Sequence, residues 1–213
     1  MEPRTRTSAY PLTFPFLLSL LLASPVQAQD VFWDGTLGSP QDFATAGNWQ
    51  GNTLPSPGDT AVFGLNGDQQ VELSTNISVG AVRRDAGDLN LRVFGGATLS
   101  TQNGYDFSSD AGTTNALSID GAGSAADLVG TDNPFDDLFI GGAGDSTLNI
   151  QNGAQVSFDN SIRVGSNTSG DSGLSGTLNV DGANSSLLVN NRISLGSEDN
   201  AGTLNITDQA GVF

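Results

Sequence analysis

The sequence predicts an all-β fold, a β-helix (parallel solenoid) with three short strands per coil and an aromatic cap at its N-terminal end. Two observations lead to this prediction. The second half of the chain repeats one three-part pattern of apolar pairs in a fixed order. The composition is also rich in turn-forming residues, with 28 Gly and twenty Asp among 213 residues. Such residues favour short strands joined by corners over long helices.

Composition also narrows the functional classes. The chain contains neither Cys nor His, which excludes disulfide frameworks, Cys/His zinc sites, Cys nucleophiles and Ser-His-Asp triads. It has 23 acidic residues against 7 basic residues, all of them Arg, for a net charge of -16. Nucleic acids and anionic membrane surfaces bind clustered cations, so we expect neither of them as a partner.

Residues 1–28 have the order of a secretory signal peptide. Arg4 and Arg6 precede an apolar stretch over residues 12–23, and Val26 and Ala28 occupy the two recognition positions of a cleavage site. The apolar stretch is shorter than the roughly 20 residues that span a bilayer. We therefore expect export, cleavage after Ala28, and a mature chain that this segment does not insert in a membrane.

Residues 29–59 differ from the rest of the chain in their aromatic and proline content. Trp33 and Trp49 both lie here, with Phe32 and Phe43. We expect an aromatic segment in front of a solenoid to cover the open apolar core of the first coil. The alternative is an aromatic platform that stacks on a sugar; the cap is the favoured interpretation.

Coils of the solenoid are predicted over residues 60–213. Up to residue 100 they are diverged copies without the exact repeat. Each copy has alternating apolar residues, the period expected of a strand with one buried face. These strands are predicted at Thr60–Phe63, Val71–Leu73, Ile77–Gly80, Leu89–Leu91 and Thr98–Ser100.

From residue 116 the repeat is explicit and has three elements. The first reads Thr-Leu-Asn-Ile or a close variant, at 116–119, 147–150, 177–180 and 203–206. The second has a Gly directly after its apolar pair, at 138–142, 162–166 and 193–197, and the third occupies 156–158, 187–189 and 212–213. The residues that define the repeat are Leu148, Ile150, Leu178, Val180, Leu204, Ile206, Gly141, Gly165 and Gly196.

Corner residues agree with the repeat. The second position after each first element is Gly121, Asn152, Gly182 or Asp208, and these residue types tolerate the positive φ of a tight corner. Length varies mainly in one connection, which is longest over residues 166–176. Residues 29–213 would form about seven coils, a rod about 35 Å long at roughly 4.8 Å per coil.

Residues 138–156, followed by Val164-Gly165 and by residues 177–185, resemble the type V secretion and PEP-CTERM-associated repeat. Residues 32–35, 47–49 and 57–63 are similar to the start of many autotransporter passengers. The resemblance covers most of residues 32–213. It implies a right-handed β-helix passenger or surface protein of a Gram-negative bacterium, displayed at the outer membrane or released.

Neither a translocator barrel nor a sorting tail, the C-terminal parts of that family pattern, follows the repeats. We therefore expect the repeats to be C-terminally truncated, with a translocator or anchor missing.

Catalysis would have to depend on carboxylates. The alternative function is a carbohydrate-active β-helix enzyme, a polysaccharide lyase or hydrolase, in which Asp132, Asp136 and Asp137 act as acid and base. No second repeat supplies an aligned carboxylate. We expect a solvated loop at these positions and no catalytic residue.

Calcium is the other chemical question. Residues 141–145 resemble the Gly-Gly-x-Gly-x-Asp loop of calcium-binding β-rolls, but Asp145 arrives one residue early and the motif does not recur in tandem. We expect a turn and no cofactor, with Asp145, Asp136 and Asp137 as the calcium candidates. The repeated Thr and Asn columns are interpreted as outward ladders that support stacking.

These observations predict an exported, non-enzymatic β-solenoid that serves as a passenger, surface structural or adhesion module. Its expected partner is an extracellular surface, a glycan or a second copy of itself.

Overall fold

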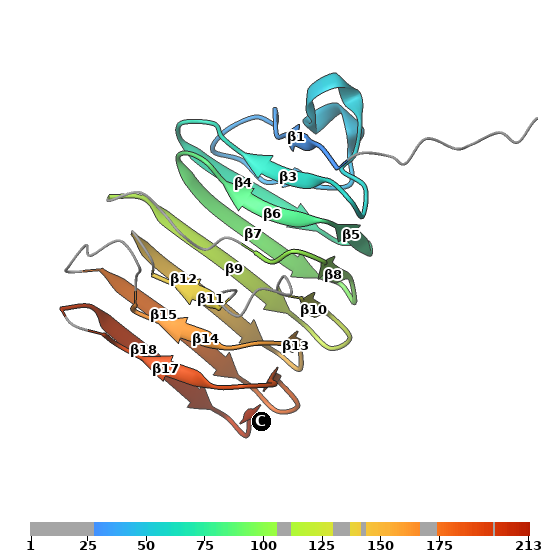
Figure 1. Cartoon of the computed structure of the whole chain (residues 1–213). Coiled ribbons are helices and arrows are strands. Elements are labelled where there is room, and N and C mark those ends of the chain that lie inside the picture. Colours follow the sequence, from blue (N-terminus) through green and yellow to red (C-terminus); the bar gives the residue numbers. More distant parts are fainter. Residues whose placement is uncertain (1–27, 106–111, 130–136, 142–143, 167–173, 198) are drawn as a thin grey trace, which may run out of the picture.

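The structure, a computed structural model, forms an all-β parallel β-solenoid of about six turns, as predicted (Figure 1). The chain winds from the N-terminal turn at one end to the C-terminal turn at the other, so that strands far apart in sequence stack side by side. The residues that the structure describes are 28–105, 112–129, 137–141, 144–166, 174–197 and 199–213.

The strands of successive turns occupy up to three positions, always in the same order. The first position holds β1 (Asp30–Phe32), β3 (Thr60–Phe63), β6 (Ala81–Arg84), β11 (Leu138–Ile140), β14 (Ile162–Val164) and β17 (Ile193–Leu195). The second holds β2 (Gln41–Asp42), β4 (Asp68–Leu73), β7 (Asp88–Phe94), β9 (Thr114–Asp120), β12 (Asp145–Gln151), β15 (Ser175–Asp181) and β18 (Ala201–Thr207). The third holds β5 (Ile77–Val79), β8 (Thr98–Thr101), β10 (Ala125–Leu128), β13 (Gln155–Phe158), β16 (Ser186–Val189) and β19 (Gly211–Val212).

Strands at one position pair in parallel with the next turn. The second position forms one seven-stranded sheet and the third one six-stranded sheet. The first position is split into the sheets β1-β3-β6 and β11-β14-β17, and between them Tyr105 makes an isolated parallel bridge to Val82. Two short 3-10 helices, η1 (Ala46–Asn48) and η2 (Gln50–Asn52), lie between β2 and β3. Among the described residues no helix is long and apolar enough to cross a bilayer.

The register of the sheets confirms the repeat residue by residue. In the seven-stranded sheet Thr147 pairs with Thr177, and Thr177 pairs with Thr203. The other two elements align in the same way: Leu138 pairs with Ile162, and Val156 with Leu187. A shift of one residue would turn every inward side chain outward, so burial of one face fixes this register.

The corners have the predicted backbone conformation. After the strands of the seven-stranded sheet, φ is +94° at Gly121, +58° at Asn152, +92° at Gly182 and +51° at Asp208. Gly, Asn and Asp adopt this left-handed region at low cost, whereas other residue types are strained there. The chemistry of a single position therefore determines where each strand stops and the chain bends.

Inward side chains of the repeat form the core. Leu148, Ile150, Leu178 and Val180 are all fully buried. The equivalent side chains of β18 are more exposed: Leu204 is partly buried, and Ile206 is 47% exposed. The reason is that β18 is the edge strand of its sheet, so its inward side chains are covered from one side only.

The predicted aromatic cap is a buried cluster at the N-terminal end. Trp33 and Trp49 meet edge to face with ring centroids 5.0 Å apart, and Phe43 lies 4.8 Å from Trp49. All three rings, with that of Phe63, are buried, so none of them offers a platform to a sugar. Phe32 differs from the prediction, because it is 37% exposed.

The capping segment is also part of the solenoid. Strand β1 pairs in parallel with β3, and β2 pairs with β4. Residues 29–59 therefore form a partial first turn in which the aromatic cluster takes the place of a third strand. The expected seven coils become this partial turn followed by about six turns.

Candidate functional site

Among the described residues, the sheet with the most strands is the seven-stranded one, and its outward side is the candidate surface. We call its C-terminal half the ladder face, defined by two columns of outward side chains on β12, β15 and β18. These columns are Thr147, Thr177 and Thr203, and Asn149, Asn179 and Asn205. Neighbouring strands lie roughly 4.8 Å apart and alternate residues roughly 6.6 Å apart. The two columns therefore form a regular grid of polar groups.

The asparagine column is bonded along the solenoid axis. The Nδ2 of Asn179 donates to Oδ1 of Asn149, and Nδ2 of Asn205 donates to Oδ1 of Asn179, both at 2.7 Å. The series of hydrogen bonds continues to β9, where Nδ2 of Asn149 donates to the hydroxyl of Ser118 at 3.2 Å. Each amide has two donors and two acceptor lone pairs, so the ladder leaves part of its hydrogen-bonding capacity unused. This column supports the stacking of turns, as expected.

The threonine column is chemically different. Within the described residues, the side-chain hydroxyls of Thr147, Thr177 and Thr203 have no hydrogen-bond partner in the protein. Thr203 is exposed and the other two are half-buried. A hydroxyl donates one hydrogen bond and accepts two. The column therefore presents a row of unused polar groups to whatever lies against the face.

Two carboxylates lie at strand ends along the border of the ladder face, Asp120 on the neighbouring strand β9 and Asp181 on β15. Asp120 accepts a hydrogen bond from Asn152 Nδ2 at 2.8 Å and forms an ion pair with Arg92. These two partners, Asn152 first and then Arg92, outweigh burial and hold the pKa of Asp120 below its ordinary value. In the next turns Asp181 pairs with the hydroxyl of Thr207. The border is thus anionic and is bonded between turns.

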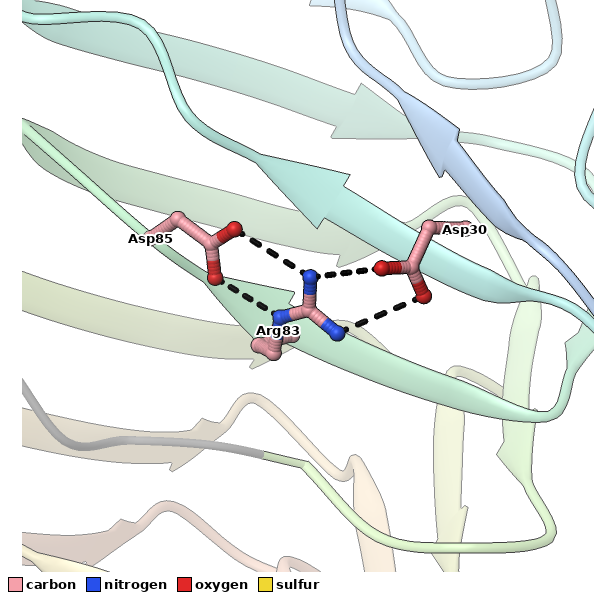
Figure 2. Close-up of polar contacts among 3 residues, drawn as sticks. All are labelled: Asp30, Arg83 and Asp85. Atoms are coloured by element: carbon pink, nitrogen blue, oxygen red, sulfur yellow. Dashed lines mark hydrogen bonds and ion pairs between the residues drawn. The ribbon is translucent and has the colours of Figure 1, made fainter.

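Arg83 links the first and third turns at the opposite end of the solenoid (Figure 2). Its guanidinium donates to Asp30 at 2.8 and 3.3 Å and to Asp85 at 2.7 and 3.2 Å. The two carboxylates, Asp85 first, raise the pKa of Arg83 above its already high ordinary value. Because β3 lies between β1 and β6, this side chain spans an intervening strand. The group is more than one-third exposed, so it stabilises the fold by about 1 kcal/mol or less.

Of the catalytic and calcium candidates, the two that are described have structural partners. Asp137 forms an ion pair with Arg163, and Asp145 accepts hydrogen bonds from the backbone N and the hydroxyl of Ser175 in the next turn. Asp132 and Asp136 lie outside the described residues. Across the described ranges, no group of three or more acidic side chains is placed to hold a metal ion.

Sequence patterns did not find the polar groups of the N-terminal turns. The side chain of Asp59 is buried, and Arg84 is buried on the inward side of β6, where it donates to the carbonyl of Gly87 at 2.8 Å. Neither residue belongs to an apolar repeat. The one available signal is the segment Pro57-Gly58-Asp59-Thr60, which carried part of the resemblance to autotransporter passengers but has no periodicity.

No family model matches the sequence, and neither the curated proteins nor the solved structures contain a match. The resemblance to the type V secretion and PEP-CTERM-associated repeat stays a prediction. The register, the corners and the stacked sheets are the properties of a β-solenoid protein.

Proposed function

We propose that the chain is an exported, non-enzymatic β-solenoid whose ladder face binds a surface glycan, as a module of an autotransporter-like or PEP-CTERM-associated surface protein. The row of threonine hydroxyls beside the bonded asparagine column is the observation that carries this proposal. Sugars present hydroxyl groups at repeated intervals, and hydroxyl and amide side chains can both donate to them and accept from them. A grid held by backbone ladders needs little reordering when a ligand binds, which favours affinity.

Charge supports an uncharged glycan, or one that carries cations, as the ligand. The net charge is -16, and the border of the ladder face carries Asp120 and Asp181. Arg83, Arg92 and Arg163 are paired with carboxylates. Such a surface repels nucleic acid and anionic lipid.

Export is supported by the accessibility of the predicted cleavage site. Ala28 and Gln29 are exposed and belong to no secondary-structure element, and the first strand among the described residues begins at Asp30. The predicted cleavage site therefore lies in accessible chain just before the β1–β3 pairing. Cleavage there would leave the solenoid whole.

We expect the double variant Thr177→Val, Thr203→Val to weaken glycan binding by about tenfold or more. Each replacement removes a hydroxyl at nearly constant volume, and two lost hydrogen bonds of about 1 kcal/mol each are worth more than one tenfold step. Binding to an array of bacterial and host surface polysaccharides, scored as dissociation constants, measures the effect. The matched control is Thr98→Val, which changes a half-buried threonine on β8, outside the ladder face.

Equal affinities of the double variant and the parent chain would remove the ladder face from the proposal. Absence of binding to every polysaccharide on the array would contradict glycan recognition itself. Unchanged melting temperatures of both variants are the check that the fold is intact.

The full chain, expressed in a Gram-negative host, is expected to be processed and exported with Gln29 as its first residue. Mass spectrometry of the purified protein identifies the mature N-terminus, and fractionation of the cells locates the protein. A full-length chain that retains residues 1–28 in the cytoplasm would contradict export. The control is Ala28→Arg, which removes the small residue that signal peptidase requires and is expected to block cleavage.

A further inference from the structure

The backbone of Gln29 is held at both of its polar atoms. Its amide N donates to Oδ1 of Asp59 at 3.1 Å, and its carbonyl accepts the backbone N–H of Thr60 at 2.9 Å. The next residue, Asp30, begins the β1–β3 ladder opposite Thr60. The position of the Gln29 nitrogen is therefore fixed relative to the Asp59 carboxylate.

Asp59 is unusual among the carboxylates in the described part of the chain because its residue is only 3% exposed. Its Oδ2 accepts the backbone N–H of Ser56 at 2.8 Å, and its carbonyl accepts the N–H of Gly80 at 2.7 Å. Burial by itself would raise the pKa of Asp59, but the hydrogen bonds from Ser56 and Gln29 outweigh it and keep the pKa below its ordinary value. The carboxylate is thus ionised at neutral pH.

The hydrogen bonds to this carboxylate come from neutral groups, the backbone amides of Gln29 and Ser56 and the side chain of Ser56, so it has no partner of opposite charge. A free α-amine at the Gln29 nitrogen would be protonated at neutral pH and would supply that charge at the same place. Charge-assisted hydrogen bonds are shorter and about twice as strong as neutral ones. The amide nitrogen of Gln29 already lies within hydrogen-bonding distance of the Asp59 carboxylate, so an α-ammonium group at the same nitrogen could donate to it without a change in the backbone.

We propose that Asp59 is the receptor for the α-ammonium group that cleavage after Ala28 creates on Gln29, so that signal removal completes an ion pair with a buried carboxylate. The inference rests on the proposed export of the chain. It assigns a role to processing beyond export, because the mature chain is more stable than one with even a single extra residue at its N-terminus.

The charged side chains on the neighbouring strands β1 and β6, and Asp85 after β6, have their own partners. Asp30 and Asp85 both bind Arg83 (Figure 2), and Arg84 donates to the carbonyl of Gly87. Strand β3 carries no titratable side chain. Asp59 is therefore the acid expected to control the ionisation of the new N-terminus.

The test compares two chains released from a fusion partner by a protease that leaves no added residue, one starting at Gln29 and the other at Ala28. We expect the Gln29 chain to melt about 2–4 °C higher at about pH 6.5, the shift that roughly 1 kcal/mol produces in a domain of this size. The ion pair raises the pKa of the amine in the folded state above its unfolded value of about 7.7–8.0. Its stabilisation is complete below that range and is lost as the pH rises through the folded pKa. The difference should therefore vanish by about pH 10.

Cyclisation of Gln29 provides a second readout. An unprotonated N-terminal amine attacks the side-chain amide carbon of its own Gln, forms the lactam and releases ammonia, a loss that mass spectrometry detects. Pairing with Asp59 keeps the amine protonated, so Asp59→Asn is expected to speed cyclisation about tenfold for each pKa unit of stabilisation lost. Asp68→Asn removes an exposed carboxylate and serves as the control.

Equal melting temperatures of the two chains at about pH 6.5 would overturn the inference. So would a difference that persists at about pH 10, or equal cyclisation rates in Asp59→Asn and the parent chain. If Asp59→Asn does not fold, the pH dependence of the two unsubstituted chains still decides. Both chains are made without residues 1–27, so equal melting temperatures would not contradict the proposed export. Conversely, a failure of processing in cells would not affect the comparison of the two purified chains.

Discussion

Replacement of Gly165 by Ala is expected to lower the free energy of unfolding by about 3 kcal/mol or more. Gly165 directly follows β14 with φ at +62°, and its N–H donates to the carbonyl of Ile140 at 2.8 Å. A Cβ there would lie 2.0 Å from the carbonyl oxygen of Ala201 in the next turn. That contact is with backbone, which cannot move away without breaking the β15–β18 ladder, so strain in the corner is combined with a steric collision.

Gly95→Ala separates the two effects. Gly95 has a similar φ of +68°, but a Cβ added to it meets nothing within 4 Å. This variant should show only the cost of a left-handed alanine, about 1–2 kcal/mol. Urea unfolding followed by far-ultraviolet circular dichroism measures both variants. Equal losses for Gly165→Ala and Gly95→Ala would show that the close approach of successive turns contributes nothing.

Trp49→Ala is expected to be the most damaging change in the N-terminal turn, at about 3–5 kcal/mol. The indole is 1% exposed, and its ring lies within 6 Å of those of Trp33, Phe43 and Phe63. Its Nε1 also donates to the carbonyl of Phe43 at 2.8 Å. Truncation leaves a cavity and an unsatisfied carbonyl at the end of the solenoid, from which unfolding can spread inward turn by turn.

The matched control is Phe32→Ala, which removes an aromatic ring from the same turn. Phe32 is 37% exposed, so a loss of about 0.5 kcal/mol is expected. Thermal unfolding followed by circular dichroism compares the two variants. If Phe32→Ala were as damaging as Trp49→Ala, the buried cluster would not be the element that closes the solenoid.

The C-terminal turns were predictable from the sequence because their strands are nearly identical in chemistry. Leu148 and Leu178 fall at equivalent positions of a period-2 pattern, and Asn152 and Gly182 mark equivalent corners. Register in a parallel stack follows from burial of one face, so repeated residues must pair with one another. The structure pairs them without a shift.

The glycines at the start of those strands were not predictable in the same way. Gly176 and Gly202 follow the loops and have no special φ, yet a Cβ on Gly176 would lie 2.0 Å from the carbonyl of Ile140. Glycine is required at these two positions because the backbones of successive turns approach closely there. A local sequence pattern contains no information on such a distance.

The N-terminal turns departed from the pattern because polar side chains take inward positions there. Strand β6 carries only two apolar residues, and Arg84 occupies an inward position and donates to a backbone carbonyl. Gln69 is likewise fully buried on β4, where it donates to the carbonyl of Ala86 at 2.9 Å. A buried polar group with a backbone partner is stable. It nevertheless interrupts the alternation of apolar residues from which a strand is predicted, so the sequence pattern does not indicate a strand there.

The sequence by itself determined the fold class, the three-strand turn, its register from residue 116 onward and the residues at its corners. These features depend on local conformational preferences and on burial of one face of each strand. Both can be recognised in the sequence from the alternation of apolar and polar residues. Only the tertiary structure decided that residues 29–59 form a partial turn, that Arg83 binds Asp30, and that Asp59 reaches the nitrogen of Gln29. Those contacts join residues about one or two turns apart in segments of unequal length, so they depend on how the chain winds and not on any repeated residue.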